Sequence, residues 1–254
     1  MSTAEPNPPK PSPRISVLMY HQVGQFLELK AHRSCYCDAG RFRSQMAWLK
    51  RTGRRVVSLT EAHAALFENV ALPSSQAVVL SFDDGYENFA AHALPVLQEF
   101  GYPSVLFAVS GLLGQEAKWL DGEGAKPLLL SGQRLRELRT AKVEIGSHTV
   151  NHPRLSRLDP VQAWREIADS KTALEDVLGE EVDFFAYPYG DYNPTVREAV
   201  MRAGYKAAVT CSRGAANTAP NPFEIPRKAI SYGDNLLGFF WKLAAKNTLK
   251  ERYG

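Results

Sequence analysis

The chain alternates short apolar runs with longer amphipathic segments from residue 14 onward. Seven of the apolar runs have the length and composition of buried strands, and they cover residues 15–20, 76–82, 104–109, 143–146, 183–187, 205–210 and 224–230. Most of them are continuously apolar, which is typical of strands that are buried on both faces. Pro226 weakens the last prediction, because proline cannot donate a hydrogen bond to a strand ladder.

Helices are predicted between these strands wherever apolar residues recur at helical spacing. The predicted helices cover residues 41–51, 60–67, 87–100, 132–139, 160–178, 194–204 and 235–246. Asp159-Pro160 and Asn193-Pro194 each place an N-cap residue before a proline that can occupy the first helical position. Thr60 is predicted to be an N-cap, and Gly204 a C-cap.

Strands that alternate with helices predict an α/β fold with a parallel sheet covered by helices. The length of 254 residues allows about seven such strands to close into a barrel. Neither an internal repeat nor a linker divides the chain, so residues 14–254 are interpreted as a single domain. Residues 1–13 contain five prolines and no apolar stretch, which predicts a disordered lead-in.

The composition is that of an ordinary globular protein, with 44% hydrophobic and 22% charged residues. The net charge of +3 comes from 30 basic and 27 acidic residues spread along the chain, a pattern that does not indicate a nucleic-acid partner. The sequence shows neither a signal peptide nor an apolar segment of the roughly 18 residues that span a bilayer. A cytoplasmic protein without a transmembrane segment is therefore the default expectation.

The three cysteines are too few, and odd in number, for a disulfide framework. Cys35 and Cys37, with His32 upstream, could form half of a metal site. Zinc sites usually space paired cysteines by two to four residues, so an ordinary loop is the favoured interpretation.

Polar residues follow several predicted strands directly, and barrel enzymes carry their chemistry at this end of the strands. Asp83 and Asp84 come after the strand at 76–82 and precede Gly85. Adjacent carboxylates repel each other and are costly to bury unless a positive charge lies beside them. A divalent cation would resolve this, with one carboxylate as its ligand and the other as a base. The alternative is a surface turn with two acids.

His148 and His152 follow the strand at 143–146 and are four residues apart. Pro153 favours a loop over a continuing helix. Two histidines and one carboxylate make three protein ligands and leave a position open for water, which is the pattern of a catalytic metal site. An exposed loop with two histidines is the alternative.

Two further strand ends carry candidate residues. Pro188-Tyr189-Gly190 follows the strand at 183–187 and could place an aromatic wall and backbone N–H groups at the mouth of the barrel, or form an ordinary tight turn. His21 follows the first strand and could serve as an acid, a base or a substrate contact. It could equally be a packed histidine with a structural role.

In this order, these strand ends resemble the polysaccharide deacetylase family, which is carbohydrate esterase family four. Residues 81–86 read Ser-Phe-Asp-Asp-Gly-Tyr and are similar to the family's Thr-Phe-Asp-Asp-Gly motif, and residues 148–152 match its His-Ser/Thr-x-x-His motif. Residues 17–23 resemble the opening of the branch that includes exopolysaccharide-modifying deacetylases. The resemblance implies an irregular (β/α) barrel with fewer than eight strands.

The resemblance also implies roles for individual residues. Asp84, His148 and His152 would bind a divalent metal, most often zinc in this family, with cobalt, nickel or manganese as alternatives. Asp83 would be the general base, and the backbone N–H of Tyr189 would stabilise the oxyanion. The implied reaction is hydrolysis of an N-acetyl group on an amino sugar such as N-acetylglucosamine, within an N-acetylated oligo- or polysaccharide, with release of acetate.

The sequence departs from better-known family members at two motif positions. Ala186 stands where those members carry an arginine that orients the base, and Gly233 stands where they carry a histidine that acts as the acid. His21 is the candidate acid in its place. Two alternatives stay open: another metal-dependent hydrolase of non-peptide C–N bonds, and a non-catalytic sugar-binding protein. The second acid, Asp83, argues against a pure binding role.

Overall fold

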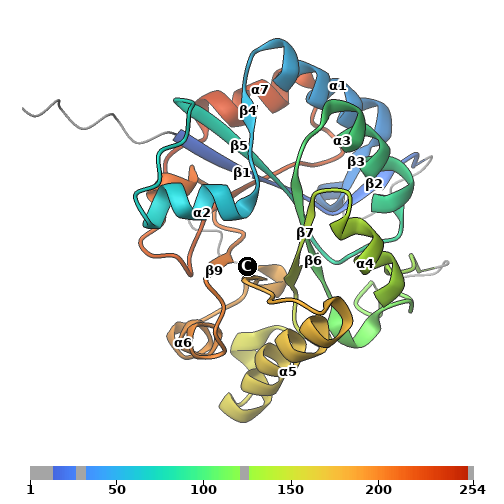
Figure 1. The fold of residues 1–254 in the computed structure, drawn as a ribbon, viewed down its shortest axis with the longest axis vertical. Coiled ribbons are helices and arrows are strands. Elements are labelled where there is room, and N and C mark those ends of the chain that lie inside the picture. The colour runs from blue at the N-terminus through green and yellow to red at the C-terminus, as the bar shows by residue number, and fades with distance from the viewer. Residues whose placement is uncertain (1–13, 27–32, 121–125, 251–254) are drawn as a thin grey trace, which may run out of the picture.

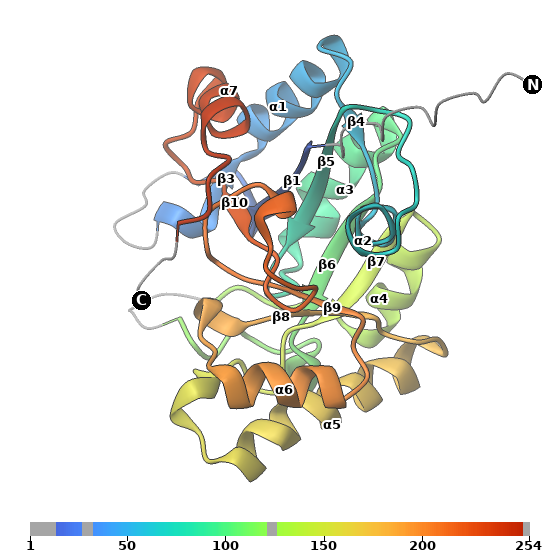
Figure 2. The same cartoon turned by 90° about the vertical axis from the view of Figure 1, so that its left-hand side faces the viewer.

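Seven parallel strands wind into a nearly closed barrel in a computed structural model that describes residues 14–26, 33–120 and 126–250 (Figures 1 and 2). The order around the barrel is β10-β1-β5-β6-β7-β8-β9. These strands are β1 (Arg14–Tyr20), β5 (Gln76–Phe82), β6 (Ser104–Ala108), β7 (Val143–Ser147), β8 (Phe184–Ala186), β9 (Ala207–Val209) and β10 (Arg227–Ala229). The α/β barrel of about seven parallel strands that the sequence predicts is confirmed.

The last two strands meet only indirectly. Val209 of β9 pairs with Ile225 through an isolated parallel bridge, in which the N–H of Ile225 donates to the carbonyl of Ala208 over 3.0 Å. The next N–H on this side, that of Arg227, donates over 2.8 Å to the carbonyl of Ser212, which lies beyond the end of β9. The strand predicted over 224–230 is therefore reduced to β10, and the barrel stays slightly open between β9 and β10.

Helices pack around the barrel and over one of its ends (Figure 1). They are α1 (Ala39–Arg51), α2 (Leu59–Phe67), α3 (Leu94–Phe100), α4 (Gly132–Arg139), α5 (Pro160–Leu178), α6 (Pro194–Arg202) and α7 (Leu236–Ala245). Three short strands were not predicted: β2 (Gln22–Gly24) and β3 (Tyr36–Asp38) pair with each other, and β4 (Arg55–Val56) pairs with the start of β5. Such short segments have too few residues for an apolar period to show.

The strands divide the apolar core into an inner and an outer part. Along β1, Ile15 and Val17 belong to the cluster inside the barrel, whereas Leu18 and Tyr20 belong to the cluster between the sheet and the helices. This alternation follows from the two-residue period of a strand. Because both faces are buried, the strands read as continuous apolar runs.

Helix α2 closes the amino-terminal end of the barrel. Its residues Leu59 and Ala62 pack in the inner cluster with Ile15 and Ala77, which begin their strands. The Glu144 carboxylate of β7 accepts hydrogen bonds from the first N–H groups of α2, with a distance of 2.7 Å to the nitrogen of Leu59. The carboxyl-terminal end of the strands therefore remains as the end at which a substrate can reach the interior.

Two helix predictions need correction. The second helix is capped by Ser58, which forms a capping box with Glu61, so Thr60 lies inside the helix and is not its N-cap. The helix predicted over 87–100 is split, because Pro95 has no N–H for the carbonyl four residues earlier. A π-helical turn at Phe89–Ala93 replaces its first half, and α3 forms the second half.

The described residues also bear on the cysteines. Cys35 ends a 3₁₀ turn (Arg33–Cys35), and Cys37 is buried in β3, so this segment is more ordered than the loop we expected. His32 and the proline-rich residues 1–13 lie outside the described residues. Within the described ranges, the structure contains no helix that is both long and apolar enough to cross a bilayer.

Candidate metal and catalytic site

The structure brings the polar strand ends together at the carboxyl-terminal end of the barrel. Asp83 and Asp84 follow β5, and His148 follows β7. The ring of Tyr189, after β8, lies 4.7 Å from the ring of His152 between centroids. His21, directly after β1, lies near enough for its charge to lower the pKa values of both aspartates.

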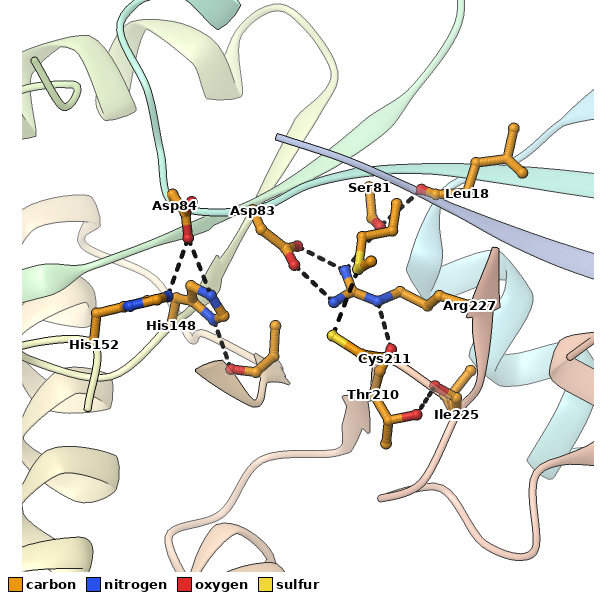
Figure 3. A network of polar contacts seen from close by, with 12 residues as sticks. Leu18, Ser81, Asp83, Asp84, His148, His152, Thr210, Cys211, Ile225 and Arg227 are labelled. Atoms are coloured by element: carbon orange, nitrogen blue, oxygen red, sulfur yellow. Dashed lines mark hydrogen bonds and ion pairs between the residues drawn. The ribbon is translucent and has the colours of Figure 1, made fainter. Parts of the chain in front are cut away.

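Asp84, His148 and His152 form a tight buried cluster (Figure 3). One carboxylate oxygen, Oδ1 of Asp84, lies 3.3 Å from Nε2 of His148 and 3.2 Å from Nε2 of His152. These candidate ligand atoms all lie within 4.8 Å of one another, and no cysteine belongs to the group within the parts of the chain that the structure describes. The three side chains can therefore reach one cation.

The contact of His148 with the backbone shows that this cluster needs a positive charge. Its Nδ1 lies 2.7 Å from the carbonyl oxygen of Ala186. Because a carbonyl oxygen can only accept a hydrogen bond, Nδ1 must carry the proton. In the neutral ring, the lone pair of Nε2 then points at the carboxylate of Asp84. Two lone pairs at 3.3 Å repel unless a proton or a metal ion lies between them. The donor set of two imidazoles and one carboxylate fits a divalent metal such as zinc.

The ionisation of the cluster also suits a metal site. Burial alone would raise the pKa of Asp84, but the two imidazoles outweigh burial and hold this pKa well below its usual value. Burial lowers the pKa of His152 and favours its neutral, ligating form. The buried hydroxyl of Tyr86 also hydrogen-bonds to Asp84 and helps to fix the orientation of the carboxylate.

Asp83 has a different partner, the guanidinium of Arg227 from β10 (Figure 3). Nη1 and Nη2 of Arg227 donate to the two carboxylate oxygens over 2.6 and 2.7 Å, and both side chains are buried. Nε of Arg227 donates to the carbonyl of Thr210, and Nη1 also donates to Oγ of Ser81. These contacts hold the guanidinium plane in place, and a bidentate pair of this kind fixes the carboxylate plane as well.

The ion pair with Arg227 decides the charge of Asp83. Burial would raise the pKa of this carboxyl group, but the charge and hydrogen bonds of Arg227 outweigh burial and bring the pKa below its usual value. Asp83 is therefore ionised near neutral pH. Each carboxylate oxygen has two lone pairs, so an acceptor position remains after the bonds to Arg227.

Glu166 of α5 holds the loop that carries the histidines. Oε2 of Glu166 accepts hydrogen bonds from the N–H groups of Val150 and Asn151 over 3.0 and 2.8 Å, and Oε1 accepts from the Asn151 amide. Within the loop, Oγ1 of Thr149 accepts a hydrogen bond from the N–H of His152. The loop is therefore fixed from outside the barrel by a side chain that does not reach the cluster.

Backbone strain is concentrated at this site. Of the six non-glycine residues with positive φ in the described residues, four lie here, with φ values of 73° at Asp84, 69° at Thr149, 62° at His152 and 60° at Tyr189. A left-handed conformation costs a non-glycine residue about 1–3 kcal/mol and persists only where surrounding contacts enforce it. The hydrogen bonds of Glu166 and Thr149 provide such contacts for the histidine loop.

Aromatic residues form the rim of the site. The ring of Trp119 stacks on His152 with centroids 4.2 Å apart, and the exposed ring of Tyr189 meets the same imidazole at a steeper angle. The guanidinium of Arg154 lies 4.4 Å from the centroid of the Tyr189 ring. Flat aromatic faces beside a polar centre suit a ligand that is both apolar and hydroxylated, such as a sugar ring.

The sequence analysis missed Arg227, Glu166 and Tyr86 around the acids and the histidine loop, and Trp119 and Arg154 at the rim. The sequence could have indicated the role of Arg227. This arginine lies in the middle of the strand predicted over 224–230, and an arginine in a strand that is buried on both faces needs an acidic partner. The adjacent acids Asp83 and Asp84 likewise require positive charge. Glu166 had no such signal, because it lies on an amphipathic helix among other charged residues.

Comparison with known proteins agrees with this geometry. A sequence model of the family described as polysaccharide deacetylase matches residues 72–208, which is over half of the chain. The chain is 28% identical over 220 residues to YxkH of Bacillus subtilis, covering 87% of this chain and 72% of that protein. It is 29% identical over 229 residues to the poly-beta-1,6-N-acetyl-D-glucosamine N-deacetylase of Escherichia coli, covering 78% of this chain but only 34% of that protein.

Solved structures include the Streptococcus pyogenes deacetylase PplD in complex with acetate. It superposes with a TM-score of 0.79 at 27% identity, over 91% of this chain and 98% of that one. The barrel and its site thus define a metal-dependent hydrolase that removes N-acetyl groups from carbohydrate. Within that class, the chain belongs to the polysaccharide deacetylase family, as its motifs predicted.

We expect Glu166→Ala to weaken metal binding by about ten- to a hundredfold, because the histidine loop loses three hydrogen bonds that orient it. Titration of the metal-stripped protein with zinc or cobalt measures this affinity. Asp169→Ala removes an exposed acid from the same helix and should leave the affinity unchanged. Equal affinities for the Glu166 and Asp169 variants would show that the loop does not need this anchor.

We expect Arg227→Met to lower the free energy of unfolding of the metal-stripped protein by about 3–5 kcal/mol at neutral pH, because Asp83 is left buried without its partner. In the wild type, the depressed pKa of Asp83 contributes stability above the unfolded-state pKa of about 4 and loses it as the pH falls through the folded-state pKa. In the variant, burial raises the folded-state pKa of Asp83, so stability falls as the pH rises above about 4.

Urea unfolding across a pH series measures this difference. The double variant Asp83→Asn/Arg227→Met carries no unpaired charge and should recover most of the loss at neutral pH. If Arg227→Met were as stable as the wild type at neutral pH, Arg227 could not be the partner that keeps Asp83 ionised.

Proposed function

We propose that the site hydrolyses the N-acetyl group of an amino sugar within an N-acetylated oligo- or polysaccharide and releases acetate, with zinc as the metal. The observation that carries this proposal is that two adjacent buried carboxylates have different partners. Asp84 faces the two imidazoles, and Asp83 faces Arg227. One acid is thereby available to a cation, and the other stays ionised beside it.

The roles of the side chains follow from these contacts. Asp84, His148 and His152 would hold a divalent cation, which would supply Lewis acidity and lower the pKa of a water molecule beside it. Asp83 accepts the proton of the attacking water, since Arg227 keeps it ionised and fixes its plane. The contact of His148 with the Ala186 carbonyl directs Nε2 toward the ligand position.

The later steps need an oxyanion donor and an acid. We assign the first role to the backbone N–H of Tyr189, because the positive φ of this residue sets the turn that places it against His152. We assign the second role to His21, which lies near both aspartates and whose Nδ1 is buried without a hydrogen-bond partner among the described residues. As an acid, His21 would donate a proton to the leaving amine.

The aromatic rim favours a sugar over a small aliphatic amide. Trp119 and Tyr189 flank the imidazole of His152 and offer ring faces on which a pyranose can stack. The Escherichia coli relative is named for its action on poly-beta-1,6-N-acetyl-D-glucosamine, and we propose a substrate of that chemical class here.

A non-catalytic role was suggested by the absence of the family's arginine at Ala186 and of its histidine at Gly233. Arg227 contacts Asp83 from a different strand than the one that carries Ala186. An arginine is therefore available to orient the base, although it stands at another position in the sequence. A pure binding protein would gain little from keeping a second buried acid ionised at this cost in desolvation. The contact of Arg227 therefore supports an active enzyme.

We expect Asp83→Asn to retain metal and lose at least about a hundredfold in turnover, because general-base catalysis typically contributes that much or more. Asp84→Ala, His148→Ala and His152→Ala should each lose both metal and turnover. Acetate release from N-acetylated oligosaccharides with added zinc, cobalt or nickel measures turnover, and metal analysis of the purified variants measures occupancy. Full activity of Asp83→Asn would refute its assignment as the base.

We expect His21→Ala to separate amide from ester hydrolysis. An amine leaves only after protonation, whereas a nitrophenolate leaves without it, so loss of the acid should affect the N-acetyl substrate far more than an aryl acetate. The ratio of kcat/KM for the two substrates, in wild type and variant, measures this. A fall of the same size for both substrates would mean that His21 is not the acid.

A further inference from the structure

Helix α7 turns an apolar face toward solvent as well as toward the barrel. Phe239 and Leu243 are buried against the sheet, whereas Leu237 is 78% exposed, Trp241 60% and Phe240 45%. The exposed residues lie three and four positions apart and share one outer face of the helix. A cluster of large apolar side chains on a convex helix face indicates a contact surface.

The charged side chains of α1 and α7 are basic, and two of them pair with acids that flank these helices: Arg43 with Glu99 and Lys242 with Asp234. Residues 39–51 of α1 contain Arg41, Arg43, Lys50 and Arg51 and no acid, and residues 235–250 contain Lys242, Lys246 and Lys250 and no acid. Helices α1 and α7 lie side by side in both views (Figures 1 and 2). Lys50, Arg51 and Lys250 form no ion pair with a carboxylate anywhere in residues 14–26, 33–120 and 126–250.

A crevice with an arginine adjoins the apolar face directly. The ring of Phe240 lies 5.9 Å from the ring of Trp48 between centroids, and the guanidinium of Arg54 lies 5.3 Å from the centroid of Trp48. The crevice has a volume of about 380 Å³, and its lining includes Trp48, Gly53, Arg54, Ser74, Ser75 and Phe240. It is thus a cationic and hydroxyl-bearing hollow beside an aromatic surface.

The crevice holds one cation, Arg54, which no acid of the described chain neutralises. Arg54 donates to Oε1 of Gln76 and has no carboxylate partner in the described ranges. Burial and the nearby charge of Arg14, which pairs with Gln76 across β1 and β5, lower the pKa of Arg54. An anion in the crevice beside Arg54 would offset this repulsion.

We propose that the outer face of α7 and the adjoining end of α1 dock on an anionic lipid surface. Leu237, Phe240 and Trp241 enter the boundary between headgroups and acyl chains, which is where such side chains partition on amphipathic helices. Arg54 in the crevice contacts a lipid phosphate, and the lysines and arginines of both helices add attraction to the surface.

A lipid surface fits this face better than a second copy of the chain. A two-fold symmetric contact through α7 would bring two faces together on which Lys50, Arg51 and Lys250 have no carboxylate partner in the described ranges, and like charges oppose such a contact. Docking through α7 also leaves the metal site accessible, because the two places lie at opposite ends of β5. Gln76, at the start of β5, lines the crevice, whereas Asp83 and Asp84 follow the end of this strand. The proposal does not depend on the chemistry of the site.

Co-sedimentation of the full chain with vesicles tests the proposal. We expect binding to vesicles of phosphatidylcholine mixed with phosphatidylglycerol, little binding to phosphatidylcholine alone, and weaker binding as salt is added. Leu237→Ser/Trp241→Ser should lower the affinity by about tenfold or more, and Arg54→Gln by about fivefold. Met201→Ser removes another exposed apolar residue, which lies on α6, and should have no effect.

Acetate release from a soluble N-acetylated oligosaccharide shows that the variants are folded, since none of these residues lies at the metal site. Equal vesicle binding by the wild type and the α7 variants would overturn the proposal, as would failure of the wild type to bind the anionic vesicles. A dimer that is lost in Leu237→Ser/Trp241→Ser, without any vesicle binding, would also overturn it and assign the face to a second copy.

Discussion

Two neighbouring carboxylates are buried at the carboxyl end of β5, and the rest of the site is arranged so that both can remain ionised. Asp83 and Asp84 would repel each other strongly in a shared environment. The chain separates their environments by turning Asp84 into a left-handed conformation toward the histidines, while Asp83 points to Arg227. Each acid thereby has its own source of positive charge, and the two can take different chemical roles.

The supports of this arrangement come from elements that are far apart in the sequence. Arg227 arrives from the last strand, the Ala186 carbonyl from β8 and Glu166 from α5. The parallel barrel brings the ends of β5, β7 and β8 to the same rim, and the long side chain of Arg227 reaches Asp83 there from the start of β10. The cost is strain at four residues with positive φ, which the hydrogen bonds of the surrounding loops offset.

The sequence predicted the barrel well because apolar runs and capping residues are local signals. It failed where one residue changes the backbone through a missing N–H, as Pro95 does. The cluster of Asp84 with the two histidines could be predicted, because all three follow apolar strands and carry ligand chemistry. The role of Arg227 could not be read from motif positions: the family's arginine is expected near Ala186, and only the register of β10 beside β1 shows that another arginine reaches the same carboxylate.

The position of Arg227 has a consequence for how the molecule is made. The three side chains of the cluster are all present once the ribosome has passed residue 152, but the partner of Asp83 is synthesised some 75 residues later, where Arg227 follows in the sequence. Until then, a nascent barrel holds an acid that has no counter-charge and resists burial. Addition of β10 therefore completes the sheet of the barrel and also gives Asp83 its counter-charge. A chain that ended before β10 would lose both stability and activity.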